Sequence, residues 1–257
     1  MTSNILGNIT NRYLITNSDL YEDIILYHFL HPIERGFYVD VGCSDPVYGS
    51  ITKFFYDRDW SGINIDALSH EIDKYSNLRP RDLNCFGGVS NKEGQLAFWA
   101  CNEAPGLSTF DEETAVSLSG ETNIFGGRWT FTEITVPVVT LNYILDTYLQ
   151  SEVIHFLKID VEQHERQVLE GIDLSRYKPW IIMVEATKPY TMIPTHQNWE
   201  QILLDNNYEF LLQSSVNRFY AISEKKNELQ QNYLTHPVTP VMRLEEYLRI
   251  NELLSSS

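Results

Sequence analysis

The chain has 257 residues, enough for one α/β domain with a large core and too few for two independent cores. Apolar residues make up 43% and charged residues 21%, which argues against a disordered chain. The formal net charge is −16 and no cluster of Lys or Arg interrupts it. This argues against nucleic acid or an anionic membrane as a partner, because both require positive charge on the protein.

The cysteines and the N-terminal sequence predict the compartment. Cys43, Cys85 and Cys101 form no CxxC pair, so neither a zinc cluster nor a disulfide framework is indicated. The start MTSNILGNITNRYL has no basic segment followed by an apolar one, as a signal peptide would. No apolar run approaches the roughly 20 residues that span a bilayer. We therefore expect a cytoplasmic protein without a membrane span.

The first elements alternate between helix and strand. Residues 18–31 predict a helix with Ser18 or Asp19 as its N-cap, ended by Pro32. Short apolar runs predict buried parallel strands, and periodic segments between them predict helices. The expected order continues with strand 37–41, helix 50–59, strand 61–66, helix 69–78 and strand 83–91. This order is typical of half a Rossmann unit with right-handed crossovers.

The middle of the chain contains a long segment with little periodicity. Strand 95–101 precedes it, and strand 133–140 and helix 141–151 follow it. The segment 102–132 is rich in Gly, Ser, Thr and Glu, and structureless spans of this length are usually functional. We therefore expect it to be a substrate-recognition insert. Phe125, Trp129 and Phe131 could stack on a substrate there, with Glu112, Glu113 and Arg128 bonding its polar groups; an ordinary packed loop is the alternative.

The second half is expected to complete a sheet of about seven strands. The predicted elements are strand 153–160, helix 162–171 closed by Gly171, strand 180–187, helix 197–206, and a hairpin of strands 208–215 and 217–223. The predicted fold is α/β, with a seven-stranded mostly parallel sheet, helices on both faces and an antiparallel C-terminal hairpin. We expect one domain over 1–225 and a helical tail over 226–257. The tail's helix near 242–254 could pack on the domain or form a homo-oligomer.

Four acidic residues end predicted strands: Asp40, Asp66, Asp160 and Glu185. Ligands of open α/β sheets bind beyond the carboxyl ends of the strands, so these positions predict a site. Asp40 precedes Gly42, whose missing side chain allows a tight turn, and its charge suits a cationic ligand and would repel a phosphate. The G-x-G-x-x-G loop of NAD-binding proteins is absent. Asp66 could accept hydrogen bonds from ribose hydroxyls, although either residue could simply cap a turn.

The segment KIDVEQHE (158–165) concentrates ionisable groups at a strand-to-helix junction. Such a concentration is costly to bury and indicates a site. His164 could act as a general base, because its ordinary pKa lies near neutrality. Asp160 and Glu185 could instead hold a divalent metal ion, Mg²⁺ or Mn²⁺, through oxygen ligands. An N-capping acid followed by solvated charges remains the alternative.

These residues together resemble the FkbM family of S-adenosylmethionine-dependent methyltransferases. The matching pieces cover about 36–223 and include FYVDVGCSDP, SGINIDALS, RPRD, LST, VTLNYILD, IHFLKIDVEQHERQVLEGID and WIIMVEAT. The resemblance implies a Rossmann-like class I methyltransferase fold that methylates a hydroxyl, often on a sugar of a glycan, nucleotide-sugar or natural product. The family commonly has Gly where this chain has Gln163, and a small, Asn-like loop where it has Cys43 and Ser44.

The resemblance also implies roles for individual residues. Asp40 and Gly42 would line the methionine part of S-adenosylmethionine, Asp66 would hold its ribose, and the turn Gly88–Ser90 would border its adenine. The expected cofactor-binding residues are Asp40, Gly42, Ser44, Ser50, Asp66, Ala67, Gly88, Ser90 and Asp160.

The expected reaction is the transfer of a methyl group to a hydroxyl of a small-molecule or glycan acceptor. His164 takes the proton, Asp160 orients the acceptor or a metal ion, and Glu162 assists; a metal-free and a metal-assisted route both remain open. Two other functions are alternatives. One is a non-catalytic subunit of the same fold that binds a partner or glycan, and the other is a nucleotide-sugar oxidoreductase, which the missing glycine motif disfavours.

Overall fold

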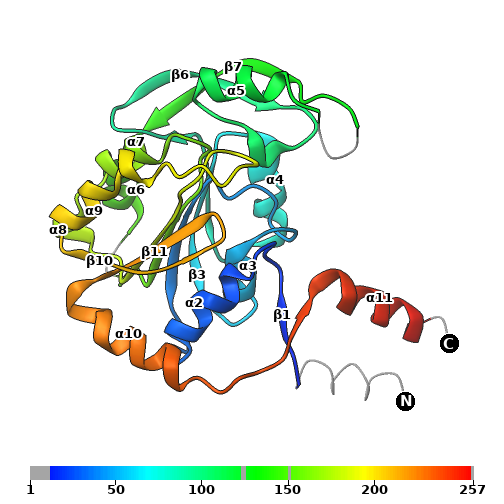
Figure 1. Cartoon of the computed structure of the whole chain (residues 1–257), viewed down its shortest axis with the longest axis vertical. Coiled ribbons are helices and arrows are strands. Elements are labelled where there is room, and N and C mark those ends of the chain that lie inside the picture. Colours follow the sequence, from blue (N-terminus) through cyan, green and yellow to red (C-terminus); the bar gives the residue numbers. More distant parts are fainter. Residues whose placement is uncertain (1–11, 123–125, 150–151, 256–257) are drawn as a thin grey trace.

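A seven-stranded mixed sheet forms the centre of the molecule in the computed structural model, which describes residues 12–122, 126–149 and 152–255 (Figure 1). Its strand order is β10-β11-β9-β8-β2-β3-β4. The strands, in chain order, are β2 (Phe37–Val41), β3 (Ser61–Asp66), β4 (Leu83–Phe86), β8 (Phe156–Ile159), β9 (Ile181–Glu185), β10 (Tyr208–Ser214) and β11 (Asn217–Ile222).

One strand of this sheet, β11, runs opposite to all the others. The five strands from β4 to β9 are parallel, whereas β11 runs antiparallel to both β9 and β10. The predicted α/β class and the C-terminal hairpin are confirmed. The chain leaves β2 toward β3 on one side, and β8 pairs with β2 on the other. Connections therefore diverge between β2 and β8, where open α/β sheets leave a crevice.

Alternating side chains of the central strands bury both faces of the sheet. Val39 and Leu157 face a cluster completed by helices α6, α7 and α9, whereas Tyr38 and Phe156 face one completed by α2, α3 and α10. Because strand residues alternate in direction, each strand supplies both cores. The helices are α2 (Glu22–Leu30), α3 (Ile51–Tyr56), α4 (Ser69–Leu78), α5 (Glu112–Ser119), α6 (Leu141–Tyr148), α7 (Glu165–Glu170), α8 (Leu174–Tyr177), α9 (Glu200–Asp205), α10 (Ser223–Thr235) and α11 (Leu244–Ser255).

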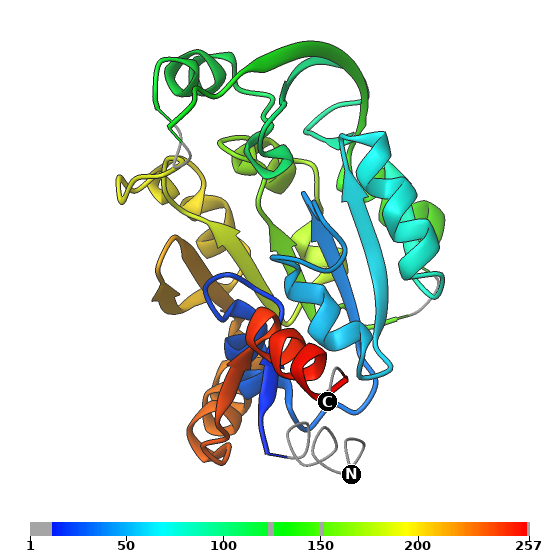
Figure 2. The same cartoon turned by 90° about the vertical axis from the view of Figure 1, so that its right-hand side faces the viewer.

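A second, three-stranded sheet stands above the carboxyl ends of the central strands (Figures 1 and 2). It consists of β5 (Gly88–Val89), β6 (Gly94–Cys101) and β7 (Phe131–Val139), in the order β5-β7-β6. The predicted strand 83–91 is thus divided at Gly87, whose φ of 140° turns the chain from one sheet into the other. Strands β6 and β7 lie outside the main sheet.

The first helix begins later than predicted. It starts at Glu22, and neither Ser18 nor Asp19 caps it. The carboxylate of Asp23 accepts hydrogen bonds from Thr16 Oγ1 (2.7 Å) and Ser18 Oγ (2.9 Å) instead. Because these bonds hold residues 16–18 in a turn, the helix cannot extend further toward the N-terminus.

The C-terminal segment packs against the domain. The helix α10, which the sequence did not predict, spans the expected 225/226 boundary and buries Leu229 in the core beside α2. Farther on, β12 (Val241–Arg243) pairs in parallel with β1 (Leu14–Thr16), so the two ends of the described chain lie side by side (Figure 1). The predicted terminal helix is present as α11. No helix in the described ranges has the length and apolar character that crossing a membrane requires.

Candidate functional site

A cavity of about 290 Å³ lies at the carboxyl ends of β2, β3, β8 and β9, where the strand order predicts a ligand. Ten of the residues proposed from sequence line it: Asp40, Gly42, Ser44, Ser50, Asp66, Ala67, Gly88, Asp160, Glu162 and Glu185. His164 and Ser90 are not among the lining residues; they bond to each other beneath the surface. Residues far apart in sequence therefore meet at one edge of the sheet.

Gly42 ends β2 in a conformation that another residue would find difficult. Its φ is +78°, and a Cβ there would lie 1.9 Å from the carbonyl oxygen of Asp160. The glycine thus lets two chain segments approach each other at the floor of the cavity. The contact that requires glycine is with the loop after β8.

Lys158 neutralises the carboxylate of Asp40 in the wall of the cavity. Its Nζ lies 3.2 Å from Asp40 Oδ1 and 3.6 Å from Asp160 Oδ2, and it donates to the carbonyl of Gly42. Burial alone would lower the pKa of Lys158, but the two carboxylates outweigh it and raise that pKa. Thr52 donates to the second oxygen of Asp40 at 3.0 Å. Asp40 is therefore already paired, rather than an isolated charge waiting for a cationic ligand.

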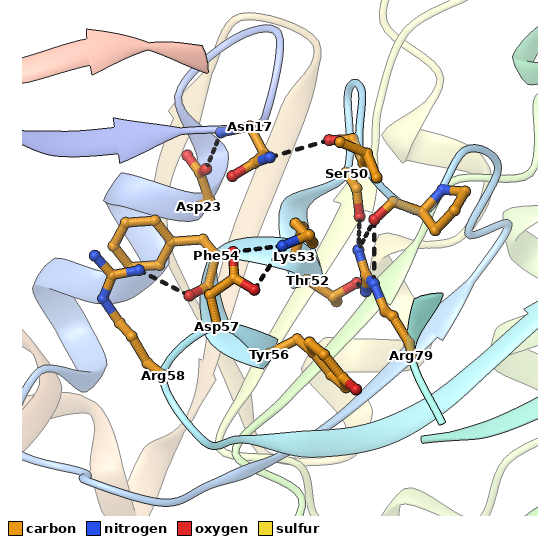
Figure 3. Close-up of polar contacts among 12 residues, drawn as sticks. Asn17, Asp23, Ser50, Thr52, Lys53, Phe54, Tyr56, Asp57, Arg58 and Arg79 are labelled. Atoms are coloured by element: carbon orange, nitrogen blue, oxygen red, sulfur yellow. Dashed lines mark hydrogen bonds and ion pairs between the residues drawn. The ribbon is translucent and has the colours of Figure 1, made fainter. Parts of the chain in front are cut away.

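Arg79 ties the loop after β2 to the end of α4 (Figure 3). This fully buried side chain donates to Ser50 Oγ at 2.5 Å, to Thr52 Oγ1 at 2.7 Å and to the carbonyl of Pro46 at 3.1 Å. Because Thr52 in turn donates to Asp40, Arg79 helps to hold the Asp40 carboxylate in place. Sequence reasoning did not assign Arg79 a function, although its segment RPRD was part of the family resemblance.

Asp66 ends β3 with one carboxylate oxygen accepting from the backbone of Ser44 at 2.9 Å and the other from Leu68 at 2.8 Å. Burial raises the pKa of Asp66 to about 6, although these two hydrogen bonds act to lower it. A carboxylate has about four lone-pair sites, so capacity remains for a ligand's hydroxyls. Ser44 has φ +50°, in the left-handed region that Asn adopts more readily than most residues. This conformation fits the Asn-like loop that the resembling family has at this position.

Three carboxylates meet on the other side of the cavity: Asp160, Glu162 and Glu185, from here on the carboxylate cluster. One oxygen from each lies within 4.8 Å of the others. Burial raises the pKa of Glu162 and of Glu185 well above the ordinary value, and the neighbouring carboxylates add to the effect. Oε2 of Glu162 and Oε2 of Glu185 are buried and accept no hydrogen bond from the described residues.

Glu165 and Gln163 shape the loop that carries Glu162. Glu165 Oε1 accepts from the backbone of Gln163 at 3.0 Å, and burial raises the pKa of Glu165 to about 7. Gln163 has φ +79°, a left-handed conformation that favours glycine, the residue common at this position in the resembling family. Its side-chain Nε2 donates to the carbonyl of Thr187 at 3.0 Å. That bond ties the loop to the end of β9.

His164 packs inside the protein. It forms the N-cap of α7, its Nε2 lies 3.2 Å from Ser90 Oγ, and its ring centroid lies 5.0 Å from that of Phe110. Burial lowers its pKa to about 4. The ring is therefore neutral at physiological pH, one residue layer behind the cavity wall.

The insert 102–132 contributes to the cavity with its first part. Pro105, Gly106, Ser108 and Phe110 line it, and Thr109 donates to the carbonyl of Glu162. The sequence had not singled these residues out, except that LST (107–109) belonged to the resemblance.

The later part of the insert is mainly packed. Trp129 is buried with Leu107 and Leu118, and Phe131 packs against them. Trp129 also stacks on the exposed Tyr190, with ring centroids 5.6 Å apart. The packed-loop alternative thus describes Trp129 and Phe131, whereas Phe125 lies outside the described residues.

Comparison with known proteins returned one match. The family model described as "Methyltransferase FkbM domain" matches residues 40–210, which include every cavity residue proposed from sequence. The chain matches no curated protein and no solved structure.

Proposed function

The chain belongs to the FkbM methyltransferase family, and from that premise we propose that it is an S-adenosylmethionine-dependent O-methyltransferase acting on a sugar hydroxyl. The acceptor would be a glycan, a nucleotide-sugar or a natural product, as the family resemblance implies.

One observation carries the choice of cofactor: the cavity is rich in negative charge. Among the described residues, six acidic side chains and one lysine line it: Asp19, Asp40, Asp66, Asp160, Glu162, Glu185 and Lys158. S-adenosylmethionine carries a sulfonium and an ammonium against one carboxylate, so its net charge is positive. A dinucleotide carries a pyrophosphate, which these carboxylates would repel.

The cofactor would extend across the sheet edge. Asp66 would accept hydrogen bonds from the ribose hydroxyls, and Gly88 with Ala67 would border the adenine. Gly42, Ser44 and Ser50 would enclose the methionine part. The reactive sulfonium would then face the carboxylate cluster, where the acceptor hydroxyl would lie.

Methyl transfer requires alignment and removal of a proton. The acceptor oxygen attacks the methyl carbon, the carbon–sulfur bond breaks, and its electron pair returns to sulfur as S-adenosylhomocysteine. The hydroxyl proton would pass to a carboxylate of the carboxylate cluster, which lines the cavity beside the position proposed for the acceptor. His164, first considered as the base, would position Ser90 and Phe110 beneath the cofactor instead.

Calorimetric titration with S-adenosylmethionine tests the cofactor, with NAD as the negative control. We expect binding to the wild type, loss in Asp66→Ala, and unchanged binding in Asp73→Asn, which alters an exposed acid of α4. Wild-type protein that binds NAD, or neither ligand, would contradict the proposal. Binding without turnover of any sugar acceptor would favour the non-catalytic binding subunit.

A further inference from the structure

The carboxylate cluster contains more negative charge than its surroundings balance. Glu162 and Glu185 are 7% and 8% exposed, and Asp160 lies between them at the end of β8. Lys158 is the cation bonded to the group, and it contacts Asp160 while also pairing with Asp40. Glu162 and Glu185 therefore have no cation of their own among the described residues.

Buried carboxylates of this kind relieve their repulsion either by binding protons or by binding a cation. The geometry of the three carboxylates favours binding of a cation over a shared proton. A shared proton needs only two carboxylates, but here three converge, two from the loop after β8 and one from the end of β9. Glu162 reaches that point from a backbone with φ +51°, a conformation with a steric cost for glutamate.

The spacing of the oxygens matches the coordination sphere of a hard divalent ion. Ligand oxygens at about 2.1 Å from Mg²⁺ lie roughly 3 to 4 Å from each other, and those around the larger Ca²⁺ lie somewhat farther apart. The ligand oxygens of Asp160, Glu162 and Glu185 all lie within 4.8 Å. In addition, Oε2 of Glu162 and Oε2 of Glu185 are buried acceptors without a donor.

We infer that Asp160, Glu162 and Glu185 form a binding site for one divalent metal ion, of the Mg²⁺ or Mn²⁺ class, that opens into the cavity. All three residues line the cavity, so the coordination positions that they leave free face the space proposed for the acceptor. Binding of the metal ion does not depend on the proposed function. Its role in catalysis, which would be to lower the pKa of an acceptor hydroxyl, rests on the proposed function.

Neutral variants of the cluster test the site against a matched control. Glu162→Gln and Glu185→Gln each remove one ligand charge and preserve the side-chain shape. Glu71→Gln is the control, because Glu71 is equally buried but belongs to α4, is paired with Lys74 and lies outside the carboxylate cluster. The probe is Mn²⁺ alone, followed by electron paramagnetic resonance and by the melting temperature.

We expect about one Mn²⁺ per chain in the wild type and a rise in melting temperature on its addition. Altering groups that only support a metal ligand commonly costs 10- to 100-fold in affinity, so losing a ligand should weaken Mn²⁺ binding by at least roughly tenfold in Glu162→Gln and Glu185→Gln. Glu71→Gln should bind Mn²⁺ as the wild type does. The rise in melting temperature on addition of Mn²⁺ should be smaller in both ligand variants than in the wild type.

Three results would overturn the site. The first is no binding of Mn²⁺, Mg²⁺ or Ca²⁺ by the wild type, and the second is binding that both ligand variants leave intact. The third is equal weakening in Glu71→Gln, because the effect would then come from the general negative charge of the protein. S-adenosylmethionine binding measured separately in EDTA decides the proposed cofactor, so failure of one proposal is distinguishable from failure of the other.

Discussion

At the scale of single residues, backbone conformation constrains the site most at Gly42. It combines φ +78° with a contact that leaves no room for a Cβ, whereas Gly126 has a similar φ of +81° and no described atom within 4 Å of its Cβ position. Left-handed strain alone costs about 1 to 2 kcal/mol. We expect Gly42→Ala to lose at least about 3 kcal/mol of unfolding free energy, because the Asp160 carbonyl must move as well.

Chemical denaturation of both alanine variants measures this difference. Gly126→Ala should lose about 1 to 2 kcal/mol, the cost of strain without a clash. Equal losses in the two variants would show that the close approach of the Asp160 loop has no energetic consequence.

Gln163 offers a second test of backbone strain at the site. Its φ of +79° disfavours any side chain, but its hydrogen bond to Thr187 offsets part of that cost. Gln163→Ala keeps the strain and loses the bond, so it should lose about 1 kcal/mol. Gln163→Gly also loses the bond but relieves the strain, and its unfolding free energy should lie about 1 kcal/mol above that of the alanine variant. An alanine variant as stable as the glycine variant would argue against strain at this position.

His164 predicts how stability depends on pH. Its pKa is about 4 in the folded protein and near 6.5 in the unfolded chain. Between these values the unfolded chain binds more protons, so stability is complete above pH 6.5 and falls as the pH is lowered toward 4. The loss should reach roughly 3 kcal/mol.

Denaturant melts of wild type and His164→Gln across pH 4 to 7 measure this contribution. The variant should lose less unfolding free energy than the wild type as the pH falls from about 6.5 to 4. The remaining decline, which comes from carboxylates, should be the same in both proteins. Parallel pH profiles for the two proteins would show that His164 does not titrate on unfolding.

At the scale of elements, α10 decides whether the C-terminal segment belongs to the domain. Leu229 is 1% exposed against α2, whereas Leu234 on the same helix is 75% exposed. Leu229→Ala should lose about 2 to 5 kcal/mol of unfolding free energy, because it leaves a cavity in the core. Leu234→Ala should change stability by no more than about 0.5 kcal/mol. If Leu229→Ala proved equally harmless, α10 would be a detachable tail after all.

The glycine at the end of α7 shows how an element can be predicted for the wrong reason. Gly171 does end the helix, but its φ is −88°, so it is not the left-handed cap expected from sequence. A Cβ at Gly171 would lie 2.4 Å from the carbonyl of Ser90. Glycine is needed there because α7 packs closely on the segment after β5.

At the scale of the whole molecule, charge predicts how the cavity distinguishes cofactor from product. The net charge of −16 and the acidic cavity wall attract a cationic ligand, and salt screens that attraction. S-adenosylhomocysteine has no net charge. Raising the salt concentration from about 0.01 to 0.5 M should therefore weaken S-adenosylmethionine binding several-fold and leave S-adenosylhomocysteine binding nearly constant. Calorimetry at both concentrations measures this, and equal salt dependence for the two ligands would refute the electrostatic account.

Local sequence determined the class of fold and most of its central strands. Apolar runs such as 37–41 and 181–185 are recognisable because a parallel strand covered on both faces must be apolar throughout. The acids at the strand ends could be identified too, because they follow directly after such runs. These features depend on residues that are adjacent in the chain, so the order of apolar and acidic residues predicts them.

Only the tertiary structure decided which of those acids share a site and which are paired. Lys158 on β8 pairs with Asp40 on the neighbouring strand β2. Glu162, from the loop after β8, meets Glu185 at the end of β9, and His164 turns inward to Ser90. The separation of β6 and β7 into a second sheet and the packing of α10 on α2 were likewise decided by partners far away in sequence. Pairing and burial depend on distances between segments, and hydrophobic periodicity within one segment carries no information about them.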